Sequence, residues 1–209
     1  MSNLTLNVEA NTERHASQSR YGGWLIISFL FLATFCVFGV TVIAFIMLTP
    51  AMASEFGWTS VETGLLVSAM WLTAPLSLFA QPVIKRVGIW RVLLAGLLLL
   101  ATTLLVFPLV SNIPQMIALR LAMGIGKVAV IVCIPVILAS WFTSKFSTAL
   151  AIVWAGGSAG GLIMAPVTEQ LISNVGWRET PYVLAAGVFI TFVFGVLVMR
   201  VAQRRTEGA

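Results

Sequence analysis

Long apolar runs constrain this chain more than any other feature of its sequence. Each run has roughly 19–26 residues, enough at about 1.5 Å per residue for a helix to cross a hydrocarbon core of about 30 Å. Transmembrane β-strands would instead be about ten residues long and would alternate apolar and polar side chains. We therefore predict six transmembrane helices, over residues 24–49, 61–81, 91–110, 114–139, 147–172 and 180–199.

The composition favours lipid over water as the solvent of these helices. Of the 209 residues, 59% are hydrophobic and 9% are charged, whereas soluble domains carry about 25% charged residues. Lipid tolerates exposed apolar side chains, but it demands that backbone polar groups be satisfied internally, as they are in helices. We expect an all-α membrane protein in which residues 21–200 form one compact bundle. A polar N-terminal tail, 1–20, and a basic C-terminal tail, 201–209, flank that bundle.

The distribution of lysine and arginine predicts that both termini are cytoplasmic. Cytoplasmic loops carry an excess of these residues. With the N-terminus inside, nine cations fall on the cytoplasmic side, Arg178 falls on the opposite side, and two lie within a predicted helix. We expect a multi-pass protein of the bacterial inner (plasma) membrane. The nine are Arg14, Arg20, Lys85, Arg86, Arg91, Lys145, Arg200, Arg204 and Arg205.

The residues that several function classes need are missing from the sequence. The chain has one histidine, His15, and no aspartate, so it offers no catalytic triad, carboxylate pair or set of metal ligands. We expect no enzymatic activity, no metal and no cofactor. Because the cations are scattered over short loops, we also expect no nucleic-acid partner. Cys36 and Cys133 lie in apolar runs and are expected to be packing residues.

Two cations lie inside the fourth predicted helix, where a charge costs about 2.5–3.5 kcal/mol on insertion scales. Arg120 and Lys127 are seven positions apart, which places them on one helix face, about 10 Å apart along the axis. We predict that this face points into the bundle and that one or both of these residues contact an anionic substrate. The alternative is structural: Arg120 bonds backbone carbonyls, and Lys127 either snorkels or pairs with a glutamate such as Glu62 or Glu169.

Small residues gather in the fourth and fifth predicted helices. Glycine lets a second helix approach closely, and six small residues in a row also weaken a helix and permit bending. The pattern indicates helix packing, and a moving element in a transport cycle would use the same residues. The predicted packing and gating positions are Gly124, Gly126, Gly156, Gly157, Gly160, Gly161 and Pro166.

Seven short motifs follow one another along the chain: YGGW at 21–24, FGWTSVET at 56–63, RVGIWR at 86–91, RLAMGIG at 120–126, WF at 141–142, GGSAGG at 156–161 and GWR at 176–178. Their order resembles the N-terminal six-helix half of the major facilitator superfamily. The branch that they resemble most is that of the monocarboxylate transporters and oxalate/formate antiporters. The resemblance assigns Lys85, Arg86, Gly88 and Arg91 to a basic cytoplasmic loop motif. Lys127 is not part of the fourth-helix motif of the family.

The resemblance implies a half bundle, which six helices would fit as a three-plus-three inverted repeat. It also implies alternating-access transport of a small organic anion such as a monocarboxylate. Members of the family carry about twelve helices in two halves, with the substrate between them. We expect either a half-transporter that pairs with itself or with a separate chain, or a truncated, non-transporting membrane remnant or scaffold. The sequence leaves both alternatives open.

Overall fold

The computed structural model describes residues 22–142 and 145–206, with side chains up to residue 202. The predicted N-terminal tail, residues 143 and 144, and the side chains of Arg204 and Arg205 lie outside the described part. Within it, all regular secondary structure is helical, and six helices are long and apolar enough to cross a membrane. The predicted all-α fold is therefore confirmed. The spans are Gly22–Phe56, Ser60–Val87, Ile89–Leu109, Ile113–Trp141, Phe146–Val175 and Thr180–Ala202.

Several spans are divided into elements of different helical pitch. The first contains a π-helical segment, which is a rare geometry in helices. The second contains a 3-10 segment of ten residues. The elements are η1 (Gly39–Ala44), α2 (Phe45–Phe56), α3 (Ser60–Ala69), η2 (Met70–Phe79), α4 (Ala80–Val87), α5 (Ile89–Val106), η3 (Phe107–Leu109), α6 (Ile113–Trp141), α7 (Phe146–Val175) and α8 (Thr180–Thr206).

Local signals end and begin these helices where the apolar runs break. Gly57 adopts φ +68°, in the left-handed region that favours glycine, and ends α2. Thr59 and Glu62 then form a capping box at the start of α3: the Glu62 carboxylate accepts from the Thr59 backbone N–H at 2.7 Å. Asn112 caps α6 by accepting from the backbone N–H of Gln115 at 3.0 Å.

The connection between the second and third spans is shorter than the sequence suggested. We expected a basic loop from Lys85 to Arg91, but α4 continues to Val87 and α5 begins at Ile89. Gly88, at φ +96°, is the single residue between the two helices. The reason is physical: Lys85 and Arg86 are good helix formers, so the helix continues past the point where the apolar run ends.

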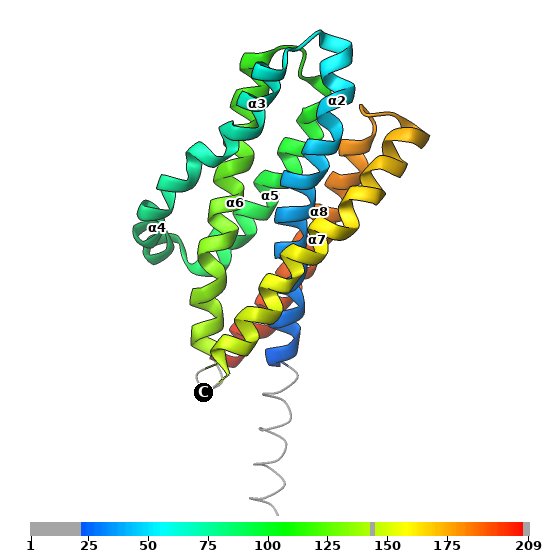
Figure 1. Ribbon diagram of the computed structural model, residues 1–209. Helices are drawn as coiled ribbons and strands as arrows, with labels where there is room; N and C mark the ends of the chain where they lie inside the picture. Colours follow the sequence, from blue (N-terminus) through cyan, green and yellow to red (C-terminus); the bar gives the residue numbers. More distant parts are fainter. Residues whose placement is uncertain (1–21, 143–144, 207–209) are drawn as a thin grey trace, which may run out of the picture.

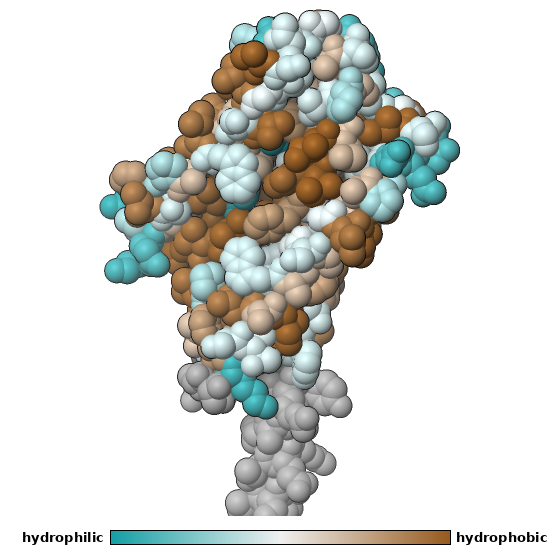
Figure 2. Space-filling view, viewed as in Figure 1, coloured by the Kyte–Doolittle hydropathy of each residue, from teal (hydrophilic) through white to brown (hydrophobic). Residues whose placement is uncertain are grey.

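The six spans form two layers (Figure 1). In front, the first span pairs with α7, and η2 pairs with α6; α5 and α8 lie behind them. The α5–α6 crossing is close because Gly96 and Gly126 face each other: a side chain on Gly126 would meet the Gly96 carbonyl at 2.9 Å. The face viewed in Figure 2 is apolar across its middle, with hydrophilic side chains at its margins. The seam between the two front pairs is where the buried cations lie.

Candidate functional site

Arg120 is bonded to the backbones of two neighbouring spans. Its side chain is 1% exposed. Nη1 donates to the carbonyl oxygen of Thr41 in η1 at 2.8 Å, and Nε donates to the carbonyl oxygen of Leu66 in α3 at 3.2 Å. The guanidinium carbon also lies 3.7 Å from the ring centroid of Phe45. These are the contacts of the structural alternative, in which Arg120 satisfies backbone carbonyls and ties the first two spans to α6.

Lys127 lies two turns further along the same face of α6 and has no such partners. The residue is 5% exposed, and its Nζ has no hydrogen-bond partner among the described residues. Nζ lies 3.2 Å from the ring centroid of Trp71 in η2 and 5.6 Å from that of Phe38 in the first span. The described part of the chain places no carboxylate within 4 Å of it. Lys127 therefore neither snorkels nor pairs with a described glutamate.

A cavity of about 220 Å³ adjoins Lys127 between η2 and α6. Its walls include Trp71, Thr73 and Ser77 from η2 and Ile131 from α6. The cavity is mainly apolar with hydroxyl groups at one wall, and it is large enough for a small organic molecule. A buried ammonium beside an apolar cavity strongly favours an anionic occupant, because an unpaired buried charge costs several kcal/mol.

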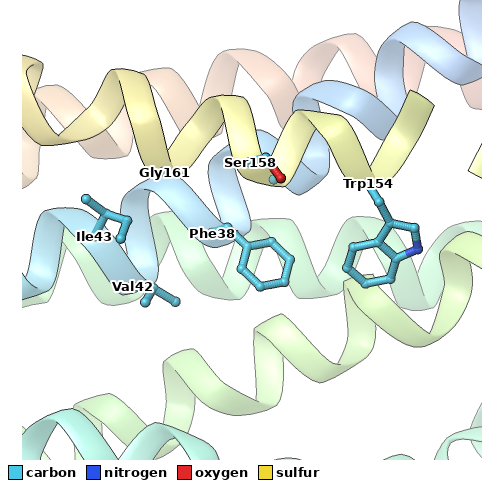
Figure 3. Close-up of a pocket in the computed structure, with 7 residues that line it drawn as sticks. Phe38, Val42, Ile43, Trp154, Ser158 and Gly161 are labelled. Carbon is cyan, nitrogen blue, oxygen red and sulfur yellow. The ribbon is translucent and has the colours of Figure 1, made fainter. Parts of the chain in front are cut away.

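A second cavity, of about 390 Å³, lies between the first span and α7. In Figure 3 the rings of Phe38 and Trp154 lie side by side beneath α7, near the hydroxyl of Ser158. Their ring centroids are 5.9 Å apart in an edge-to-face arrangement. We call this second cavity the groove. Phe38 lines the groove, and its ring also lies near the ammonium of Lys127.

The predicted packing glycines differ in which atoms a side chain added to each of them would meet. A side chain on Gly124 would strike Thr73 and the Met70 carbonyl of η2, and one on Gly156 would strike the Phe31 carbonyl of the first span. Pro166 lies within α7, which continues through it from Phe146 to Val175. Gly160 also lies close to a neighbouring backbone: a side-chain carbon added to it would lie 2.5 Å from the Phe35 carbonyl oxygen.

Gly157 and Gly161 instead line the groove between the first span and α7. An added carbon on Gly157 would meet the Phe38 ring at 2.8 Å, so this glycine sets how close the ring can lie to α7. The same carbon on Gly161 would meet only Ile43, at an ordinary 3.8 Å. The loop-motif residues Lys85, Arg86, Gly88 and Arg91 are exposed at the α4–α5 junction and lie outside both cavities.

A cluster at the other end of the first span was missed by the sequence predictions. Arg178 forms an ion pair with Glu55 and donates to the carbonyl oxygen of Pro108 at 3.1 Å. Trp177 Nε1 donates to the same Glu55 carboxylate at 2.7 Å. The cluster joins the ends of the first and third spans to the α7–α8 connection. The sequence signal was Arg178 itself, the one lysine or arginine that the sequence predicts on that side of the membrane.

Trp71 and Phe38, the two rings that flank Lys127, were also missed. Five of the seven tryptophans lie at span ends, the usual place for indole rings in membrane proteins. Trp71 and Trp154 lie inside their spans, and each lines one of the two cavities. That departure from the usual position was the available signal. Phe38 carried none, because it is one of thirteen phenylalanines in an apolar chain.

The fold and the buried cations define a multi-pass helical membrane protein with a candidate anion site between its spans. The sequence model of the Major Facilitator Superfamily matches residues 30–209, and the chain belongs to that superfamily. The predicted resemblance is therefore confirmed.

The curated relatives are transporters. "Probable anion transporter 1, chloroplastic" of Oryza sativa subsp. japonica is 31% identical over 66% of this chain and 27% of its own length. "Monocarboxylate transporter 12" of Homo sapiens is 26% identical over 84% of this chain and 34% of its own length. "Monocarboxylate transporter 12-B" of Danio rerio is 25% identical over 89% of this chain and 39% of its own length. The chain thus spans less than half the length of the curated relatives that it matches.

Proposed function

We propose that this six-helix unit moves a small organic anion, such as a monocarboxylate, across a membrane by alternating access, with Lys127 as its anion contact. One observation carries the proposal: the Lys127 ammonium is buried between two aromatic rings and has no hydrogen-bond acceptor among the described residues. A carboxylate would supply both the missing acceptor and the missing opposite charge. The relatives, which are named as anion and monocarboxylate transporters, support the same substrate class.

Arg120 has a supporting role in this proposal. Its bonds to Thr41 and Leu66 hold the first and second spans against α6, and these are the spans that carry Phe38 and Trp71. The guanidinium also adds positive potential about two helical turns, or about 10 Å, from Lys127. Direct contact between Arg120 and the anion stays a prediction. It ranks below the assignment of Lys127, because the two hydrogen bonds of Arg120 would first have to break.

The transport pathway, in this proposal, runs along the seam between the two front pairs of spans. A second six-helix unit would close that seam. The greater length of the curated relatives supports this arrangement. We further propose that both termini are cytoplasmic and that the membrane is a bacterial inner membrane, on the strength of the lysine and arginine distribution.

Equilibrium binding tests the assignment of Lys127. The purified chain in lipid nanodiscs is titrated with butyrate in a calorimeter. We expect Lys127→Gln to weaken binding at least tenfold, since a hydrogen bond to a charged group contributes about 1.5–3 kcal/mol, and Lys127→Arg to retain part of it. Arg200→Gln, which removes an exposed cation on α8, is the matched control and should bind as the parent does.

Two results would overturn the assignment. One is butyrate binding of equal strength in the parent chain and in a folded Lys127→Gln variant. The other is the absence of any binding to the parent chain. The second result would favour the alternative of a non-transporting membrane scaffold. Thermal unfolding of each variant, measured alongside, separates loss of the site from loss of the fold.

A further inference from the structure

The groove between the first span and α7 has the chemistry of an apolar subsite. Its walls include the rings of Phe38 and Trp154, the aliphatic side chains of Val42 and Ile43, and one hydroxyl, that of Ser158 (Figure 3). No described residue that lines it is charged. Such a groove binds hydrocarbon or an aromatic ring well and a second charge poorly.

Phe38 joins this groove to the unpaired ammonium. Nζ of Lys127 is 5.6 Å from the Phe38 ring centroid, and that ring is in turn 5.9 Å from the Trp154 ring. The Phe38 ring is therefore next to both the ammonium of Lys127 and the Trp154 ring that lines the groove. A molecule whose carboxylate lies at Lys127 would extend its carbon chain past Phe38 towards Trp154.

Gly161 has no packing reason to be glycine. Gly156 and Gly160 are pressed against the backbone of the first span, whereas a side chain on Gly161 would meet only Ile43 at van der Waals distance. Glycine inside a helix lowers stability relative to alanine. Gly161 lines the groove, so the absence of a side chain there widens the groove.

The wall opposite Gly161 is also unusual. Val42 and Ile43 belong to η1, the π-helical segment, and π-helical turns occur frequently at functional sites. The groove thus has an irregular helix on one side and a glycine without a packing contact on the other. Trp154, which lies inside α7 rather than at a membrane interface, closes one end.

We propose that this groove holds the apolar tail of the transported anion, so that the protein selects monocarboxylates with a tail of several carbons over short or doubly charged acids. The proposal rests on the assignment of Lys127 as the anion contact and goes beyond it by defining the rest of the substrate. The carboxylate sets the strength of binding common to all members of the class, and the groove adds a contribution that grows with tail length.

A chain-length series tests the two contributions separately. Straight-chain monocarboxylates from acetate to octanoate are titrated into the purified chain in nanodiscs, with empty nanodiscs as the blank. Each methylene that leaves water contributes about 0.8 kcal/mol, so Kd should fall about fourfold per carbon until the groove is full. Succinate should bind more weakly than butyrate, because its second carboxylate would enter an uncharged groove.

The variant Gly161→Leu fills the groove without an initial clash at its first side-chain carbon. It should leave acetate binding unchanged and remove most of the dependence on chain length. Gly187→Leu is the matched control: it makes the same change in α8 at a glycine with nothing within 4 Å of the added carbon, and it should keep the full series.

The outcomes separate this proposal from the assignment of Lys127. Binding that depends on Lys127 but not on chain length would overturn the tail groove alone. A chain-length dependence of equal slope in the parent and in Gly161→Leu would reflect partition into lipid and would also overturn it. A series in which neither Lys127→Gln nor Gly161→Leu changes any Kd would overturn both.

Discussion

Arg120 and Lys127 show two ways in which a membrane helix accommodates a buried cation. The planar guanidinium of Arg120 reaches two carbonyl oxygens on different spans, and its face lies over Phe45. The ammonium of Lys127 has only the faces of two aromatic rings, and it lies closer to Trp71. A cation–π contact compensates part of the lost hydration but supplies no acceptor. Of the two, Lys127 is therefore the residue to which our proposal assigns the anion.

This difference predicts opposite effects on stability. Arg120→Met removes two hydrogen bonds from a charged donor, each worth about 1.5–3 kcal/mol, and should lower the free energy of unfolding by about 3 kcal/mol or more. Lys127→Met removes an unpaired charge and keeps the volume, so stability should stay the same or rise. Thermal unfolding of both variants in the same detergent compares their stabilities. A Lys127→Met variant less stable than Arg120→Met would contradict the contacts described for both residues.

At the residue scale, the sequence predicted the positions of these cations and offered backbone carbonyls as partners of Arg120, but it did not predict which carbonyls or the rings beside Lys127. A spacing of seven residues was enough to place Arg120 and Lys127 on one face of α6. The acceptor at Thr41 lies in a π-helical segment that no spacing rule predicts, because such segments depend on how neighbouring helices pack. Trp71 was overlooked because an aromatic residue in an apolar run is most often a lipid-facing or core residue.

At the element scale, helix α7 shows how two neighbouring glycines can have different surroundings. Gly160 faces the first span so closely that a methyl group would lie 2.5 Å from the Phe35 carbonyl oxygen. Gly161, the next residue, faces the groove. One helix thus uses small residues both for close packing and to leave an opening.

Alanine at these two positions should separate the two uses. Gly160→Ala should lower the free energy of unfolding by about 1–3 kcal/mol, because backbone atoms cannot move aside as a flexible side chain does. Gly161→Ala should raise it by up to about 1 kcal/mol, through helix propensity alone. Thermal unfolding monitored by circular dichroism compares them. Equal destabilisation by the two substitutions would show that Gly161 is also a packing residue.

At the element scale, hydropathy predicted the number and order of the helices and was less accurate at their ends. The first and second spans extend to Phe56 and Val87, several residues beyond the predicted 49 and 81. Helices continue beyond their apolar part where the following residues favour helix and lie at the aqueous interface. The glycines at 57 and 88, both with positive φ, mark the true ends.

The molecule as a whole is a multi-pass membrane protein, and its orientation can be tested with single cysteines. Cys36 and Cys133 are buried, so they should give little background labelling. If both termini are cytoplasmic, Ser111→Cys and Ser173→Cys should react with an impermeant maleimide in intact cells, and Ser147→Cys only after permeabilisation. All three serines are exposed and lie at span ends. Labelling of Ser147→Cys alone in intact cells would reverse the predicted orientation.

The central claim is that this chain transports a small organic anion through a site at Lys127. The most direct test is counterflow of labelled butyrate into liposomes that contain the purified chain and are preloaded with unlabelled butyrate. We predict saturable uptake by the parent chain, the same uptake with Arg200→Gln, and uptake at the level of empty liposomes with Lys127→Gln. Uptake by Lys127→Gln equal to that of the parent, or no uptake by the parent, would contradict the claim.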